Sequence, residues 1–142
     1  MVIEVFIDGL AGPGNPGVGA YGFVIYQDKN KLCEGYECLG EYGSNNFAEY
    51  CGLVAALHWI LDKGLQDEEI VIKSDSMLLV NQMIGSWRVR GGFYVKKYME
   101  ARELVNHLPQ IRFVWISREK NTEADALSKK AFGEWCKTGK RN

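Results

Sequence analysis

The sequence predicts an α/β fold in which helices flank a mixed β-sheet. Three consecutive segments with β-strand patterns, joined by short turns, occupy the first third of the chain, and helical and strand patterns alternate after them. The 142 residues, 46% apolar and 25% charged by type, are typical of one soluble globular domain that needs no disulfide or structural metal. We therefore expect a single domain over residues 1–142.

The first three strands are expected to form an antiparallel meander. Each is rich in β-branched and aromatic side chains, and the loop 11–17 between the first two is dense in glycine and proline. The predicted strands are residues 2–7, 19–27 and 32–40, with a hairpin turn at 28–31.

Helices and strands alternate in the rest of the chain. Because the late strands are connected through helices, they should run parallel to their neighbours, and ligands of such sheets bind beyond the carboxyl ends of the parallel strands. The predicted helices are about 46–63, 76–84, 93–107 and 122–136, the strands are 70–74 and 111–116, and the polar tail 137–142 is expected to fray.

Composition argues against several classes of protein. No stretch approaches the roughly 20 apolar residues of a membrane helix, and the N-terminus lacks the basic start and cleavage site of a signal peptide. The four cysteines lack the spacing of a zinc site, so we expect free thiols in a reducing compartment. We expect a cytoplasmic, monomeric protein that does not bind membranes.

The net charge of −1 conceals a difference between the two halves of the chain. Residues 1–71 carry a net charge of −8, and residues 72–142 carry +7. An acidic half beside a basic half is compatible with a metal site next to a surface that binds a polyanion. Solvated helix faces would explain the same charges equally well.

Four carboxylates lie where predicted elements meet: Asp8, Glu49, Asp75 and Asp125. Each has a purely structural explanation. Asp8 could form a turn with the glycine after it, and Asp75 could cap the helix that follows. Glu49 and Asp125 each stand three residues after a capping residue, as in a capping box.

Taken together, the four carboxylates indicate a metal site. Asp8 and Glu49 lie among apolar residues, and carboxylates next to a core are rarely left without a partner. If the first and fourth strands are neighbours, Asp8 and Asp75 meet at one edge of the sheet. Clustered carboxylates repel one another, and an all-oxygen site selects hard cations such as Mg²⁺ or Mn²⁺. Two such ions roughly 4 Å apart are used in phosphodiester hydrolysis.

Several motifs, in order along the chain, resemble those of the type 1 ribonuclease H family. They are Phe6-Ile-Asp8-Gly9, Gly14-Asn15-Pro16-Gly17, Ser44-Asn45-Asn46 with Glu49, Lys73-Ser74-Asp75-Ser76, and Asn121 with Asp125. The resemblance spans essentially the whole chain. It implies the ribonuclease H-like fold, a five-stranded mixed sheet with three antiparallel and two parallel strands. It also implies a Mg²⁺-dependent endonuclease that cuts the RNA strand of an RNA/DNA hybrid and leaves 5′-phosphate and 3′-hydroxyl ends.

The resemblance also assigns roles to residues. It implies that Asp8, Glu49, Asp75 and Asp125 are the catalytic residues. The same four residues would be the ligands of two Mg²⁺ ions, which Mn²⁺ could replace. Asn15, Ser44 and Asn45 correspond to positions that contact the hybrid. Small amides and hydroxyls suit this task, because RNA is distinguished from DNA by its 2′-hydroxyls in the wide minor groove.

The chain departs from many family members in two places. Only a short segment, 87–93, separates the two middle helices, where many members carry a Lys/Arg-rich insertion, and the segment 117–120 lacks the histidine often found before the last carboxylate. Arg118 is the nearest candidate for stabilising phosphate charge, with a surface loop role as the alternative. Trp87 could stack on the substrate or pack in the core.

These departures leave two other functions open. One is a module that binds RNA/DNA hybrid or double-stranded RNA with weak or no cleavage. The other is a related nuclease that acts on double-stranded RNA.

Overall fold

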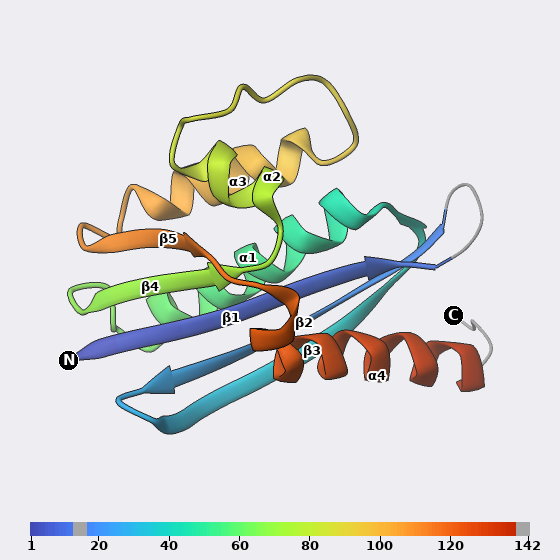
Figure 1. Cartoon of the computed structure of the whole chain (residues 1–142), viewed down its shortest axis with the longest axis horizontal. Helices are drawn as coiled ribbons and strands as arrows, with labels where there is room; N and C mark the ends of the chain where they lie inside the picture. The colour runs from blue at the N-terminus through green and yellow to red at the C-terminus, as the bar shows by residue number, and fades with distance from the viewer. Residues whose placement is uncertain (13–16, 139–142) are drawn as a thin grey trace.

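The structure, a computed structural model, describes residues 1–12 and 17–138 and contains a five-stranded sheet in the order β3-β2-β1-β4-β5 (Figure 1). β1 pairs antiparallel with β2, and β2 with β3, whereas β4 is parallel to both β1 and β5. The elements are β1 (Val2–Ala11), β2 (Gly17–Gln27), β3 (Asn30–Gly43), α1 (Asn45–Asp62), β4 (Glu69–Ser74), α2 (Met77–Met83), α3 (Val95–Val105), β5 (Ile111–Trp115), the 3-10 turn η1 (Arg118–Lys120) and α4 (Thr122–Thr138). The predicted mixed sheet is confirmed.

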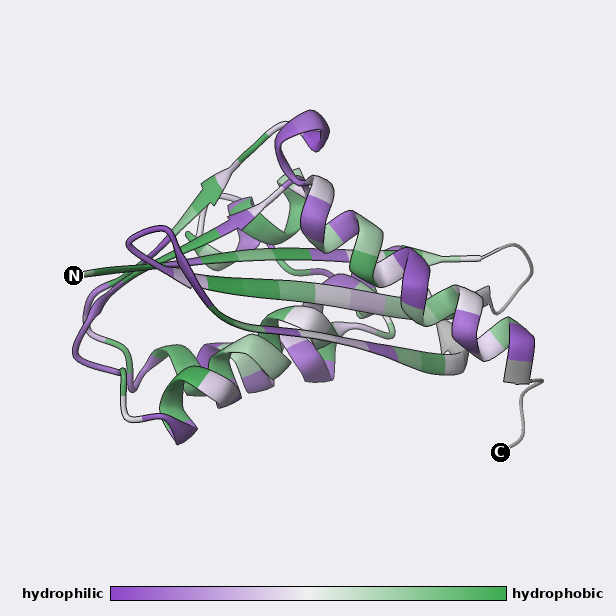
Figure 2. Cartoon of the chain, turned by 90° about the horizontal axis from the view of Figure 1, so that it is seen from below, coloured by the Kyte–Doolittle hydropathy of each residue, from purple (hydrophilic) through white to green (hydrophobic). Residues whose placement is uncertain are grey.

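Helices cover both faces of the sheet (Figure 2). α1 lies on one face and forms the main core with β1, β2 and β4, while α3 packs against α1. α4 lies on the other face, over β1, β2 and β3. The main core is built from fully buried apolar side chains that include Ile3, Ile7, Leu53, Leu57 and Ile72. None of the described helices is both long and apolar enough to cross a bilayer.

The first strands are longer than the sequence predicts. β1 does not end at residue 7 but continues through Asp8 and Gly9 to Ala11, because these residues stay paired with β2. The alternative explanation of Asp8 as part of a turn is therefore wrong. The hairpin between β2 and β3 turns at Asp28 and Lys29, both with positive φ, as a tight two-residue turn requires.

The C-terminal helix is also longer than expected. It runs to Thr138, so residues 137 and 138 of the predicted frayed tail are helical, and 139–142 lie outside the described residues. The four cysteines are free, as predicted. Cys33 packs toward the main core, whereas Cys38 on the same strand lines a cavity with Ala131 of α4, so the two thiols face opposite sides of β3.

Glycines let the helices approach the sheet closely on both faces. A Cβ atom at Gly22 of β2 would lie 2.5 Å from the Leu127 Cβ atom and 2.7 Å from the Ala124 carbonyl oxygen, both in α4. A Cβ atom at Gly9 of β1 would lie 2.5 Å from the backbone nitrogen of Glu49 in α1. Gly9 directly follows Asp8, and Gly22 is paired with Asp8 across the ladder.

We expect Gly22→Ala to destabilise the protein by about 1–3 kcal/mol, because the added methyl group has no space and forces α4 away from β2. Chemical denaturation measures the change. The matched control is Gly133→Ala in α4, where an added Cβ atom meets nothing within 4 Å. It should stabilise the helix by up to about 1 kcal/mol. A Gly22→Ala variant as stable as the control would contradict the close packing described here.

Candidate active site

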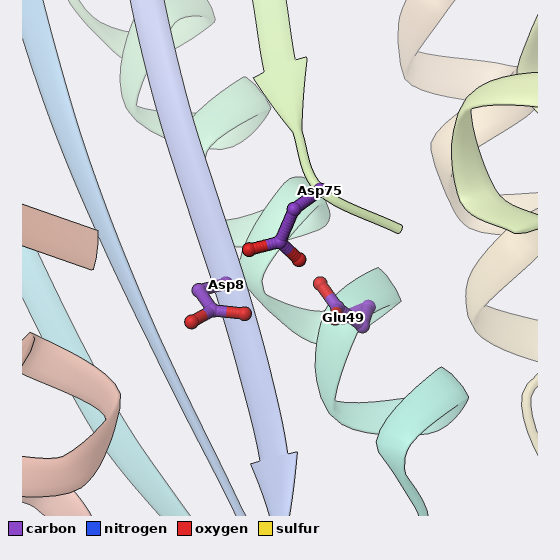
Figure 3. Close-up of side chains that lie close together, drawn as sticks. All are labelled: Asp8, Glu49 and Asp75. Atoms are coloured by element: carbon purple, nitrogen blue, oxygen red, sulfur yellow. The ribbon is translucent and has the colours of Figure 1, made fainter. Parts of the chain in front are cut away.

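Two carboxylates emerge where the parallel pairing of β1 and β4 ends. The last pair is Ile7 with Ser74, and the residue that follows each of them in the sequence is an aspartate (Figure 3). The backbone around Asp75 is held from β5, since the Trp115 indole N–H donates to the Asp75 carbonyl oxygen at 3.1 Å and the Ile116 N–H donates to the Ser74 carbonyl oxygen at 2.9 Å. Asp8 and Asp75 therefore meet at one edge of the sheet, as predicted.

Glu49 reaches the same place from α1. The helix is capped by Ser44, whose hydroxyl accepts a hydrogen bond from the Phe47 N–H at 3.2 Å. Glu49 consequently lies in the second turn, and the alternative explanation of a capping box is wrong because the cap is Ser44, two residues before Asn46. The missing side chain at Gly9 lets this turn approach β1 closely enough for the Glu49 carboxylate to face the two aspartates (Figure 3).

The three carboxylates form a cluster in which one oxygen of each lies within 4.8 Å of the others. Asp8 and Glu49 are buried, and Asp75 is half-buried. Burial, followed by the charges of Asp75 and Asp125, raises the pKa of Asp8 to about 8. Burial and the two aspartates raise the pKa of Glu49 well above its usual value. The fold thus holds three acidic groups together although desolvation and mutual repulsion both disfavour their charged forms.

The cluster fits a hard divalent cation. Glu49 Oε1 is buried and has no hydrogen-bond partner among the described residues, so this acceptor is available to a ligand. The donors are all carboxylate oxygens, which is the chemistry that Mg²⁺ and Mn²⁺ prefer. Asp8, Glu49 and Asp75 are the residues that could hold such an ion.

Asp125 lies beside this cluster but is not part of the group of three. It stands in the first turn of α4, and its hydrogen bond and charge contribute to the raised pKa of Asp8. One of its oxygens, Oδ2, also pairs with Lys129 Nζ at 3.0 Å. The capping box considered for Asp125 does not form as proposed, because α4 already includes Thr122 and the Asp125 N–H donates to the Asn121 carbonyl oxygen.

The carboxylates lie in an open cleft of about 380 Å³. Among the predicted substrate contacts, Asn45 and Arg118 line this cleft, and Ser44 is exposed beside it at the start of α1. The positive charge of Arg118 lowers the pKa of Glu49, but burial and the charges of Asp8 and Asp75 raise it by more. Trp87 is not among the residues that line the cleft; it lines a separate cavity between α2 and the connection to α3, with 46% of its surface exposed. Asn15 lies outside the described residues.

Asn121 is a residue of the site whose role was not predicted. Its side chain is 1% exposed, and its Nδ2 donates to the Ile7 carbonyl oxygen at 2.8 Å and to Asp75 Oδ2 at 3.3 Å. It therefore ties the start of α4 to the end of the parallel ladder and orients one carboxylate. The signal in the sequence was an amide directly before a helix, which reads equally well as an ordinary cap. Asn46, Ser76 and Lys129 also line the cleft.

The chain is similar to known proteins over almost all of its length. A protein family described as "Reverse transcriptase-like" matches residues 7–131. Ribonuclease HI of Halobacterium salinarum is 34% identical over 93% of this chain and 65% of its own length. Ribonuclease H of Bartonella quintana is 30% identical over 97% of this chain and 94% of its own length. The chain spans about a third of the Mycobacterium bovis and Mycobacterium tuberculosis relatives that it matches at 35% identity.

Solved structures agree with these relatives. The N-terminal RNase H domain of a Mycobacterium tuberculosis protein, solved as a fusion, superposes with a TM-score of 0.88 at 32% identity, over 98% of this chain and 99% of that chain. LC11-RNase H1, solved in complex with RNA/DNA hybrid, superposes with a TM-score of 0.85 at 34% identity, over 93% and 97% of the two chains. With its sheet order, its carboxylate cluster and these matches, the chain belongs to the type 1 ribonuclease H family.

Proposed function

We propose that this chain is a metal-dependent endonuclease that hydrolyses the RNA strand of RNA/DNA hybrids. The observation that carries the proposal is the cluster of Asp8, Glu49 and Asp75, in which a buried oxygen of Glu49 has no partner among the described residues. The similarity to a ribonuclease H solved with RNA/DNA hybrid supports the substrate. The products would carry 5′-phosphate and 3′-hydroxyl ends.

The residues of the cleft divide the work. Asp8, Glu49 and Asp75 would hold two Mg²⁺ ions, or Mn²⁺ in their place, with Asp125 beside them as the fourth acidic residue. When bound, such ions activate water and stabilise the leaving oxygen of a phosphodiester. The backbone N–H of Gly9 donates to Asp8 Oδ1 at 2.9 Å, and Asn121 donates to Asp75 Oδ2, so both aspartates are oriented before substrate arrives.

Polar and charged groups around the cleft suit a nucleic acid. Asn45 and Ser44 stand at the start of α1, where an amide and a hydroxyl could contact the 2′-hydroxyls that distinguish RNA from DNA. Arg118, at the edge of the cleft, supplies a positive charge for a phosphate group.

Asp75→Asn and Asp8→Asn should each reduce cleavage of a labelled hybrid to a few per cent or less, because each variant removes a charge needed for metal binding while keeping the shape of the side chain. Gel analysis in Mg²⁺ and in Mn²⁺ measures the rate. The matched control is Asp67→Asn, the same chemical change at an exposed position away from the cleft, which should leave the rate unchanged.

Substrate comparison tests the rest of the proposal. Double-stranded RNA, double-stranded DNA and single strands should be cut far more slowly than hybrid. Preferred cleavage of double-stranded RNA would assign a different nuclease activity to the cleft, and hybrid binding without cleavage in either metal would assign a binding module.

Metal ions should stabilise the protein most at alkaline pH. Because the pKa of Asp8 is raised in the folded state, the folded protein binds a proton that the unfolded chain has released, and this group's contribution to stability falls as pH rises from about 4 to 8. Millimolar Mg²⁺ or Mn²⁺ should therefore raise Tm by about 3 °C or more at pH 8 and much less at pH 5.5.

Asp75→Asn provides the internal control for this measurement. Without metal at pH 8 the variant should be more stable than the wild type, because it lacks one of the repelling charges, and its response to metal should be smaller. An equal response of variant and wild type would place the bound ions elsewhere.

Arg118→Ala should lower kcat/KM for hybrid by about tenfold, since an exposed cation at the cleft contributes less than a buried donor does. Arg118→Lys should recover part of the loss. The matched control is Lys120→Ala, which removes a positive charge from the same short turn but from a side chain that lines a different cavity. Equal losses in the two alanine variants would show a general effect of charge and no particular role for Arg118.

A further inference from the structure

A buried amide joins three segments next to the cavity that contains Trp87. Gln82 of α2 is 2% exposed, and burying an amide is unfavourable unless its polar atoms are hydrogen-bonded. Its Oε1 accepts from the Tyr50 hydroxyl of α1 at 2.7 Å. Its Nε2 donates to the Tyr94 hydroxyl at 3.0 Å and to the Arg88 carbonyl oxygen at 3.4 Å. Since a carbonyl oxygen only accepts, these contacts fix which way the amide points.

Aromatic packing makes this connection rigid. The ring of Tyr50 stacks on that of Tyr94 with centroids 5.6 Å apart and 14° between the planes, and it meets Tyr98 edge to face at 5.8 Å. Two of the partners of Gln82 thus hold each other in place. A fully satisfied buried network of this kind specifies one arrangement of the segments that it joins.

The segment held by Gln82 carries the cations and the exposed aromatic ring of the short connection between α2 and α3. Arg88, Arg90 and Trp87 line a cavity of about 410 Å³ with Gln82 and Tyr94. At the start of this segment, the Ser86 and Trp87 N–H groups donate to the Asn81 carbonyl oxygen. Beyond Trp87, the side chain of Gln82 holds the Arg88 carbonyl oxygen and the Tyr94 hydroxyl.

One short helix connects this cavity to the acidic cleft. Ser76 caps α2 and lines the cleft, while Gln82, near the other end of α2, lines the cavity. The six residue steps from Ser76 to Gln82 correspond to roughly 9 Å along the helix axis at 1.5 Å per residue. This is about three steps of a duplex at ~3.4 Å per step. A nucleic acid that runs along α2 from the cleft therefore extends far enough to reach Gln82 and the segment that it holds.

We propose that Gln82 is a positioning residue for substrate binding, which holds the segment 86–94 so that Trp87, Arg88 and Arg90 contact a nucleic acid whose backbone lies in the acidic cleft. The inference rests on the proposed function for the nature of the substrate. It assigns Gln82 to affinity and not to the chemical step, because its hydrogen-bond partners are Tyr50, Arg88 and Tyr94 and not the carboxylates.

The test is a comparison of Gln82→Leu with the wild type on RNA/DNA hybrid. KM should rise about tenfold with kcat within twofold, which is the pattern expected when contacts equally strong in the ground and transition states are lost. The matched control is Asn81→Ala, which removes an amide from the same helix. The Asn81 side chain donates to the Met77 carbonyl oxygen within α2. Asn81→Ala should keep the wild-type KM.

A second pair of variants separates positioning from simple loss of stability. Tyr94→Phe keeps the stacked ring but removes one hydrogen-bond partner of Gln82, so it should raise KM less than Gln82→Leu does. Tyr94→Phe should also remain folded even if Gln82→Leu unfolds. Trp87→Ala should raise KM by itself, and adding Gln82→Leu to it should have little further effect, because the positioned group is already absent. Additive losses, a fall in kcat at unchanged KM, or an unchanged KM in both Gln82→Leu and Tyr94→Phe would overturn the proposal.

Binding measurements distinguish this inference from the proposed function. In an Asp75→Asn background, the fluorescence anisotropy of labelled hybrid reports affinity without cleavage. If the wild type does not cut but the background binds hybrid about tenfold more weakly when Gln82→Leu is added, the proposed reaction fails and the role of Gln82 stands. If the wild type cuts and Gln82→Leu changes neither KM nor this affinity, the reaction stands and the role of Gln82 fails. A chain that neither cuts nor binds hybrid would overturn both.

Discussion

The site depends on a mismatch in length between two neighbouring ladders of the sheet. The parallel pairing of β1 with β4 ends at Ile7 and Ser74, whereas the antiparallel pairing of β1 with β2 continues for four more residues. Asp8 is therefore held firmly from one side while its other side is open toward Asp75. α1 approaches β1 closely at Gly9, and the Asn121 side chain donates to the Ile7 carbonyl oxygen. Both contacts therefore lie where the parallel pairing ends.

Holding these carboxylates together opposes folding, and the rest of the molecule compensates for it. Burial and repulsion raise the pKa values of Asp8 and Glu49 because their charged forms are poorly solvated. Apolar packing between α1 and the sheet supplies the stability that the cluster removes. Fixed polar contacts, such as that of the Trp115 indole with the Asp75 backbone, prevent the cluster from relaxing by separation. A site under this kind of strain is typical of binding sites for small, highly charged ions.

Sequence patterns predicted the order and type of the elements, because strand and helix periodicities are local properties. They also identified Asp8, Glu49 and Asp75, whose position after or near apolar segments is visible in the sequence. The limits of β1 and the start of α1 were not predictable, since pairing with β2 and the choice of Ser44 as cap depend on tertiary contacts. The separate location of Trp87 and the role of Asn121 depend on side-chain direction, which no spacing rule determines.

Gly9 and Gly22 fix how closely the helices that carry the site approach the sheet. At these two points, helices on opposite faces of the sheet rest against bare backbone rather than against side chains. The distance between α1 and α4 across the sheet is therefore set at these points by the main chain of β1 and β2. The apolar interior can accumulate substitutions of moderate volume while the carboxylates contributed by the two helices keep their spacing. A side chain added at Gly9 or Gly22 would therefore disturb the spacing of these carboxylates directly, because it would push a helix away from the sheet.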